Sequence, residues 1–256
     1  MDVHENDIKE MDLKDATAIV SFPTVGMIGT IVSNYLVNKM DLELIGEFSS
    51  GEFFPVIIIH KGEPVQPVRI YGGWIKDPEG NDKEKVAVIM SELPLKKEHF
   101  FPFAEKIIQW CGGKDLSQII TLEGLNTDRD FDGDENIEVF SVGSLPKMDK
   151  RIENLPVTHM ENGMISGMSG SLLYHGKTMK MPVFCFLTEA YSQFPDSRSA
   201  AATVRILNSL FTEVDMDPQP LIEEAEKIEE QVRKAMKQMK PKTPQEIPAE
   251  NFRMYG

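Results

Sequence analysis

Short apolar runs, many of them rich in β-branched residues, alternate with longer amphipathic segments along most of the chain. The runs have the length of strands, which we expect at residues 17–22, 42–48, 55–60, 68–71, 86–90, 118–122, 137–142 and 183–187. Apolar residues recur at helical spacing in three segments, at 29–40, 98–110 and 196–211. Strands that alternate with helices predict an α/β fold, a sheet covered by helices on both faces in one three-layer domain.

The ends of two of these helices carry local signals. Gly112-Gly113 follows the second helix and is expected to form its C-cap. Asp196 or Ser197 precedes the third helix and is expected to cap its N-terminus. Pro23-Thr24-Val25-Gly26 follows the first strand and predicts its exit turn.

A fourth amphipathic segment, 217–240, differs from the others in its spacing. Asp217 is a good N-cap, and Pro218 suits the first helical position. Apolar residues then recur at alternating steps of four and three, at Leu221, Ala225, Ile228, Val232, Ala235 and Met239. This heptad seam is typical of a helix that meets another helix or another subunit, but a single helix docked on its own domain has the same pattern. Both interpretations stay open.

The last sixteen residues, 241–256, form a segment of their own. Three prolines and little apolar material precede its tip, so we expect an extended, semi-rigid spacer that reaches ~30 Å. The tip is Asn251-Phe252-Arg253-Met254-Tyr255-Gly256. Large amphipathic side chains beside a terminal carboxylate suit capture in a partner's pocket. A disordered tail without function is the alternative. The expected organisation is therefore a core domain at 1–216, a helix at 217–240 and a flexible tail at 241–256.

Composition narrows the classes of partner. The chain has 256 residues, a formal net charge of −14 and a pI of about 4.9. Such a surface repels phosphates, so we expect no nucleic acid or membrane partner and a basic partner surface instead. Cys111 and Cys185 lie in apolar settings and are expected to be buried thiols in a reducing cytosol. No signal peptide or membrane-spanning run is visible, which predicts a cytoplasmic protein.

Two glycine-rich segments resemble binding or catalytic motifs in part. Gly26-Met27-Ile28-Gly29 stands where a doubly wound fold holds anions, but it lacks the full G-x-G-x-x-G pattern, and tight packing explains it better. Gly167-Met168-Ser169-Gly170-Ser171 misses the G-x-S-x-G nucleophile elbow by one position. A glycine-rich loop that leads into a short helix is the preferred interpretation.

No metal site or catalytic pair is predicted. Asp128-Arg129-Asp130-Phe131-Asp132-Gly133 resembles the first half of a calcium loop, but its twelfth position is Val139, so an acidic hairpin is the better interpretation. The five histidines show no metal-ligand spacing. Glu189 and Asp196 are single carboxylates at loop ends, which are usually caps or solvated groups. We therefore expect no cofactor.

Several segments together resemble the proteasome assembly chaperone 2 family in its archaeal form. In chain order they are Ser21-Phe22-Pro23-Thr24-Val25-Gly26-Met27-Ile28-Gly29, Gly51-Glu52-Phe53-Phe54-Pro55-Val56, Ser91-Glu92-Leu93-Pro94, Asn162-Gly163-Met164-Ile165-Ser166-Gly167-Met168-Ser169-Gly170 and Tyr191-Ser192-Gln193-Phe194-Pro195-Asp196. The resemblance covers most of residues 15–240. It implies a fold like that of purine nucleoside phosphorylases without their catalytic residues. It also implies a homo-oligomer of three to five subunits, with a tetramer favoured.

The resemblance also assigns a role to the tip of the chain. Family members that bind the proteasome end in a hydrophobic residue, a tyrosine and any residue, and Met254, Tyr255 and Gly256 occupy these positions. It implies that the Gly256 carboxylate pairs with a lysine between neighbouring α-subunits, while Tyr255 and Met254 fill the pocket beside Arg253 and Phe252.

The expected function is thus non-enzymatic. The protein would act as a proteasome assembly chaperone or as an ATP-independent activator or adaptor of the core proteasome. The alternatives are a small-molecule hydrolase or phosphorylase that uses the glycine-rich loops, and a purely structural oligomer built through the last helix.

Overall fold

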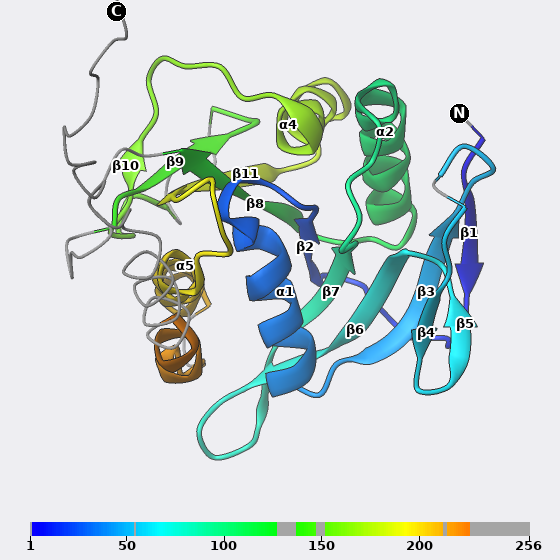
Figure 1. The fold of residues 1–256 in the computed structure, drawn as a ribbon, viewed down its shortest axis with the longest axis horizontal. Helices are drawn as coiled ribbons and strands as arrows, with labels where there is room; N and C mark the ends of the chain where they lie inside the picture. Colours follow the sequence, from blue (N-terminus) through cyan, green and yellow to red (C-terminus); the bar gives the residue numbers. More distant parts are fainter. Residues whose placement is uncertain (1, 54, 127–136, 147–151, 212–213, 226–256) are drawn as a thin grey trace, which may run out of the picture.

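The computed structural model describes residues 2–53, 55–126, 137–146, 152–211 and 214–225. Nine strands form one mixed sheet (Figure 1). They are β1 (His4–Asp7), β2 (Thr17–Ser21), β3 (Glu43–Ser49), β6 (Val68–Lys76), β7 (Asp82–Met90), β8 (Gln118–Asn126), β9 (Val139–Gly143), β10 (Thr158–His159) and β11 (Val183–Ala190). Their spatial order is β1-β3-β6-β7-β2-β8-β11-β9-β10.

The middle of the sheet is parallel, the end that starts at β1 is antiparallel, and the end that finishes at β10 is mixed. The β2 strand pairs in parallel with β7 and β8, and β8 pairs in parallel with β11. The β6 strand runs antiparallel to both β3 and β7, and β9 runs antiparallel to β11. A separate hairpin, β4 (Ile58–His60) with β5 (Glu63–Val65), lies beside the β1–β3 end of the sheet (Figure 1). The parallel centre brings the carboxyl ends of four strands to one edge.

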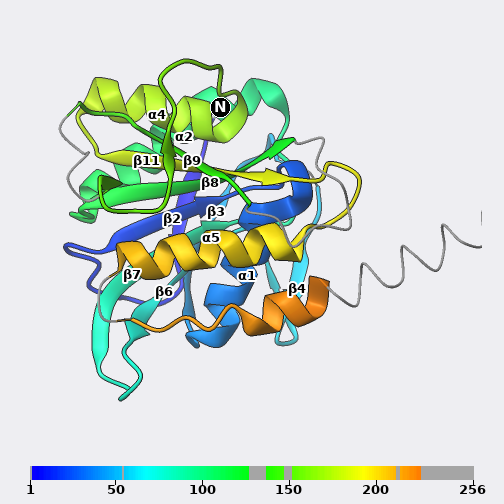
Figure 2. The same cartoon turned by 90° about the vertical axis from the view of Figure 1, so that its left-hand side faces the viewer.

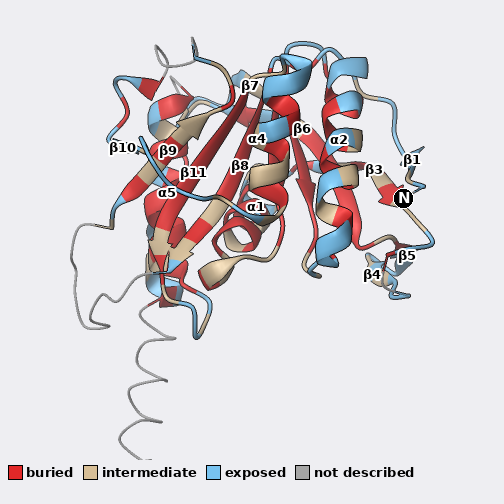
Figure 3. Ribbon diagram, turned by 90° about the horizontal axis from the view of Figure 1, so that it is seen from above, coloured by how far each residue is buried: buried red, intermediate tan, exposed pale blue. Residues whose placement is uncertain are grey.

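Helices cover both faces of the sheet, as the alternation predicts (Figure 2). One face carries α1 (Ile28–Lys39) and α5 (Ser197–Leu210), and the other carries α2 (Lys97–Gly113) and α4 (Gly167–Met179). Alternate residues of one strand divide between the two cores: Ile19 packs in the α1/α5 core, while Val20 packs in the α2/α4 core. The strands between the helical layers are buried, and the outer helix faces are exposed (Figure 3).

Most strands differ in length from the predictions, and β7, β8 and β11 are each longer than expected. The strand expected at 55–60 is shorter, because β4 covers only Ile58–His60. The strand expected at 68–71 continues as β6 to Lys76, through Gly72 and Gly73. A Cβ at either glycine would press on Ile45 or Leu42, so these glycines allow close packing inside the ladder and do not end the strand.

The predicted C-cap of α2 is wrong. Gly112 and Gly113 are the last two residues of the helix, and Lys114 stands at the C-cap. The left-handed position is Asp115, with φ of 56°. The Leu116 N–H donates to the Cys111 carbonyl across 2.9 Å, which closes the helix end in the manner of a Schellman motif. An aspartate therefore takes the conformation that glycine was expected to supply.

The chain begins its last helical segment close to the predicted cap. Asp217 accepts a hydrogen bond from the Gln219 N–H (2.9 Å), and residues 219–225 are helical. Leu221 and Ala225, the first two seam positions, are buried in the body, and Leu221 joins the α1/α5 core. The seam thus begins as a contact with its own domain. The rest of the predicted helix, the tail 241–256 and the acidic segment 128–133 lie outside the described residues, so the proposed division at 216 and 240 stays a prediction.

Candidate functional site

The loop after β2 is packed tightly between strands and helices. Gly26 has φ of 61°, and its carbonyl accepts a hydrogen bond from the Asp196 N–H (2.9 Å). A Cβ at Gly26 would lie 2.7 Å from the Ala190 Cβ, and one at Gly29 would lie 3.0 Å from the Ser21 Cβ. These contacts support the interpretation that both glycines serve tight packing, because the space beside them is already occupied by protein atoms.

The segments that carry the family resemblance meet around this loop. The Ser91 N–H donates to the Ser21 carbonyl, which joins the ends of β7 and β2. Phe53 packs edge-on against Phe103 and lines a small hollow together with Pro94. Segments separated by more than a hundred residues are therefore one contiguous region at the carboxyl edge of the parallel strands.

A largely but not fully buried carboxyl group lies in this region. Glu123, near the end of β8, is hydrogen-bonded by the hydroxyls of Ser169 and Thr24. Burial raises its pKa from 4.5 to about 7, and the two hydroxyls offset this only in part. The sequence interpretation missed Glu123. The available signal was a single carboxylate inside the largely apolar run 119–125.

Ser169, the candidate nucleophile of the partial elbow motif, is buried and held in a hydrogen-bond network. It lies in the first turn of α4, and its Oγ is 2.7 Å from the Thr121 Oγ1. It also hydrogen-bonds to Glu123 and Cys185. Among the described residues, no histidine contacts this hydroxyl. The segment 160–166 before α4 is irregular and not a strand, so the helix-entry interpretation is confirmed.

Asp196 is an N-cap, as predicted. Its Oδ1 accepts from the Ser199 N–H (2.9 Å), and its Oδ2 accepts from the Ser199 hydroxyl (2.8 Å) and the Tyr191 N–H (3.2 Å). Glu189, the other carboxylate considered, accepts a hydrogen bond from the Glu138 N–H (3.3 Å). Both carboxylates therefore bind protein groups in this structure, and Asp196 fixes the start of α5 beside Gly26.

Replacing Asp196 by alanine is expected to lower the free energy of unfolding by about 2 kcal/mol, because buried N–H groups lose their acceptor. Asp196→Asn retains the Oδ1 acceptor and is expected to lose markedly less. Urea denaturation of both variants measures the difference. Equal losses in the two variants would contradict a capping role.

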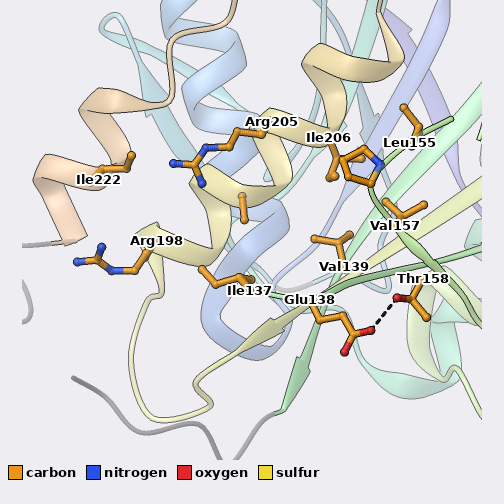
Figure 4. Close-up of a pocket in the computed structure, with 12 residues that line it drawn as sticks. Ile137, Glu138, Val139, Leu155, Val157, Thr158, Arg198, Arg205, Ile206 and Ile222 are labelled. Carbon is orange, nitrogen blue, oxygen red and sulfur yellow. Dashed lines mark hydrogen bonds between the residues drawn. The ribbon is translucent and has the colours of Figure 1, made fainter. Parts of the chain in front are cut away.

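A groove lies beside α5, away from the loop after β2, where the sheet ends in β9 and β10 (Figure 4). It has a volume of about 820 Å³. Its apolar lining comes from β9, the segment before β10, α5 and the last helical segment, at Ile137, Val139, Leu155, Pro156, Val157, Ala202, Ile206 and Ile222. Arg198 and Arg205 stand at its border, and Glu138 accepts a hydrogen bond from the Thr158 hydroxyl (2.7 Å). Sequence patterns alone did not reveal this groove.

The other candidate groups that the sequence offered are the two cysteines and any cluster of metal ligands. Cys111 and Cys185 are free and buried, as predicted, and burial raises the pKa of each thiol. No cluster of metal-ligating side chains occurs among the residues that the structure places. No helix within the described ranges is long and apolar enough to cross a membrane. The predicted binding residues Phe252, Arg253, Met254, Tyr255 and Gly256 lie outside the described residues.

The fold and the sequence together define the class of protein. The doubly covered α/β sheet carries the five resemblance segments in one region, and the PAC2 family model matches residues 18–236. The chain belongs to the PAC2 family, which confirms the resemblance drawn from the motifs.

Individual relatives match the chain over most of its length, and two of them are solved structures with the same fold. The structure of Pyrococcus furiosus PbaA, described as an archaeal homolog of proteasome-assembly chaperone, matches with a TM-score of 0.76 and 29% identity, covering 92% of each chain. The structure of P. furiosus PbaB, described as an archaeal proteasome activator, has a TM-score of 0.77 at 20% identity, over 91% of this chain and 98% of that one. The protein MJ0106 of Methanocaldococcus jannaschii is 24% identical over 90% of this chain and 89% of its own. The expected likeness to purine nucleoside phosphorylases is not tested by these relatives and stays a prediction.

Proposed function

We propose that this protein is a cytoplasmic proteasome assembly chaperone or an ATP-independent activator or adaptor that acts by binding the core proteasome and not by catalysis. Membership of the PAC2 family is the observation that carries the proposal. The relatives PbaA and PbaB, a proteasome-assembly chaperone homolog and a proteasome activator by their descriptions, support it. The chain also ends in the hydrophobic-Tyr-any sequence that the family resemblance links to proteasome binding.

In this proposal the tail is the anchor. The Gly256 carboxylate pairs with a lysine in a pocket between adjacent α-subunits. Tyr255 stacks and hydrogen-bonds at the mouth of the pocket, and Met254 fills its apolar side. Phe252 and Arg253 contact the rim. Carboxylate capture of this kind uses a cation and backbone donors, both of which bind a chain terminus in known peptide-recognition modes.

One short tail binds weakly, so the proposal requires several tails on one particle. Tethering several tails raises their effective concentration, and the gain in affinity reaches ~10²–10⁴-fold. The proline-containing spacer 241–250 allows tails from one oligomer to reach pockets whose symmetry differs from its own. The net charge of −14 would speed the encounter with a basic ring surface.

Binding of purified α-rings to chain variants tests the tail. The intact chain is expected to bind, and a chain that stops at Arg253 is expected to lose binding by about a hundredfold or more, in line with the loss of avidity. Tyr255→Ala is expected to behave like the truncation. Surface plasmon resonance on immobilised rings measures these affinities, with circular dichroism as the check on folding.

Two matched controls separate sequence-specific docking from general stickiness of the tail. Exchanging Phe252 with Tyr255 preserves composition but moves the tyrosine, and one glycine added after Gly256 moves only the carboxylate. Both variants are expected to bind as poorly as the truncation. Full binding by either variant would rule out pocket capture, and full binding by the truncated chain would move the contact to the acidic body.

A further inference from the structure

A second groove, the α1 groove, runs along the outer face of α1. Its lining comes from α1, from the loops that precede α2 and α5, and from the last helical segment, which lies beside α1 (Figure 2). The Tyr35 hydroxyl donates to the Asp217 carbonyl across 2.6 Å and joins α1 to that segment. The groove has a volume of about 530 Å³, within the ~300–1,000 Å³ of typical ligand clefts.

Three of the segments that carry the family resemblance contribute side chains to the α1 groove. Met27, Glu92 and Pro195 each come from a different one of these segments. Ile31 of α1 and Leu221 of the last helical segment add aliphatic surface. The segments thus present a shared surface besides packing against one another. An apolar cleft with a few polar groups is the usual form of a binding site.

The charged residues that line the α1 groove are acidic. Glu92 and Glu224 stand on two separate elements, and no lysine, arginine or histidine lines the groove among the described residues. Arg69 donates to the Glu92 Oε1 and offsets part of that charge, whereas Glu224 is exposed at the groove. A ligand that complements this lining is cationic.

The ionisation of Tyr35, which also lines the groove, reflects the same negative charge. Burial, with the nearby charges of Asp217 and Asp215, raises the pKa of Tyr35 to about 12. The two aspartates disfavour a further negative charge beside them. They favour a positive charge at this place for the same reason.

Two oxygen atoms at the α1 groove can accept hydrogen bonds that they lack in this structure. The Thr30 Oγ1 and the Glu92 Oε2 are buried and have no hydrogen-bond partner among the described residues, although both residues line the groove. A buried polar atom without a partner costs about 1–3 kcal/mol. A helical threonine has two favoured rotamers and a glutamate has more, so both oxygens can turn toward a donor in the groove.

We propose that the α1 groove binds a basic segment of a partner protein, in which an arginine or lysine is flanked by apolar residues. The cation pairs with Glu224 and Glu92, and its N–H groups reach Thr30, while the apolar neighbours cover Met27 and Ile31. Met27 to Asn38 spans ~16 Å along α1, the length of about five residues of extended chain, which favours a peptide segment over a small amine. This surface is separate from the tail and goes beyond the proposed function, since no proteasome is needed to measure it.

Fluorescence anisotropy with labelled pentapeptides and the full chain tests the chemistry of the ligand. A peptide of alternating leucine and arginine, blocked at both ends, is expected to bind. Replacing its leucines by serine keeps the charge and removes the apolar contacts, and replacing its arginines by glutamate does the reverse. Each replacement is expected to weaken binding by about tenfold or more.

Two adjacent glutamates supply a matched pair of variants that tests the place of binding. Glu223 and Glu224 are both exposed, but only Glu224 is among the residues that line the groove. Glu224→Lys is expected to weaken binding of the leucine–arginine peptide by about tenfold. Glu223→Lys changes the net charge equally and is expected to weaken it by less than about twofold, because an exposed charge outside the contact is screened. Asn34→Trp fills the groove and is expected to reduce binding as Glu224→Lys does. Circular dichroism confirms that each variant is folded.

Several results would overturn the proposal. Absence of peptide binding, or equal affinity for the leucine–arginine and serine–arginine peptides, would leave only general attraction to an acidic body. Equal losses in Glu223→Lys and Glu224→Lys would place the contact elsewhere. Tighter peptide binding by the chain that stops at Arg253 would show that the tail of the chain itself occupies the groove. None of these measurements involves α-rings, so this proposal and the tail proposal fail separately.

Discussion

Replacing Gly124 by alanine is expected to destabilise the fold by roughly 3 kcal/mol, the upper end for overpacking a core. A Cβ at this position would overlap the backbone carbonyl oxygen of Val25 and lie 2.7 Å from its carbon. The Gly124 N–H also donates to the Thr24 Oγ1 across 3.3 Å, which holds the loop against β8. A backbone atom cannot rotate away as a side chain can, so the loop itself must move.

Gly113→Ala is the matched control for this change. Gly113 is the last residue of α2, and a Cβ there would meet no atom within 4 Å. Alanine is expected to be neutral or to stabilise the protein by about 0.5 kcal/mol, because it reduces the freedom of the unfolded chain. Urea denaturation midpoints at a constant m-value measure both changes. Similar midpoints for the two variants would show that the loop after β2 does not pack closely against Gly124.

Glu123→Gln is expected to raise stability at alkaline pH and to leave it unchanged in acid. The pKa of Glu123 is 4.5 without burial and about 7 in the folded protein. Between these values the folded state holds a proton that the unfolded state has released, so the free energy of unfolding falls as pH rises from 4.5 to 7. Above pH 7 the full loss, about 3 kcal/mol at 1.36 kcal/mol per pH unit, is reached.

Glutamine keeps groups that can hydrogen-bond to Ser169 and Thr24 but never acquires a charge. The variant is therefore expected to match the unaltered chain near pH 4.5 and to exceed its stability by about 2–3 kcal/mol at pH 8. Thermal unfolding between pH 4.5 and 8 measures the divergence, and Glu10→Gln, at an exposed carboxyl, is the control. Parallel pH profiles for Glu123→Gln and the unaltered chain would show that this carboxyl does not titrate in that window.

These changes also bear on how the family motifs act. Gly26, Gly124 and Asp196 connect the loop after β2 to β8 and to the start of α5, and Glu123 connects it to α4. All of these contacts are internal to the body. The motif region therefore builds a rigid carboxyl edge of the sheet. In the proposed function, proteasome contact falls to the tail and the formation of oligomers to other surfaces.

The sequence by itself determined the strands and helices in which the spacing of apolar residues indicates the buried face. The apolar runs at β2, β7, β8 and β11, the helices α1, α2 and α5, and the cap at Asp196 were all predicted. Each is set by which face of one element meets the core, and that information repeats every two or every three to four residues. The family resemblance likewise followed from short segments in their order along the chain.

The tertiary structure alone decided the features that depend on distant partners. The exposed, polar β1 strand forms only because β3 offers it an edge, and β6 continues through Gly72 and Gly73 because Leu42 and Ile45 pack over them. The raised pKa of Glu123 comes from burial among strands and helices that its own neighbours in sequence do not reveal. The groove of Figure 4 and the β4–β5 hairpin stand at opposite ends of the sheet because of its strand order. Packing between segments far apart in sequence sets all four, and local periodicity carries no record of it.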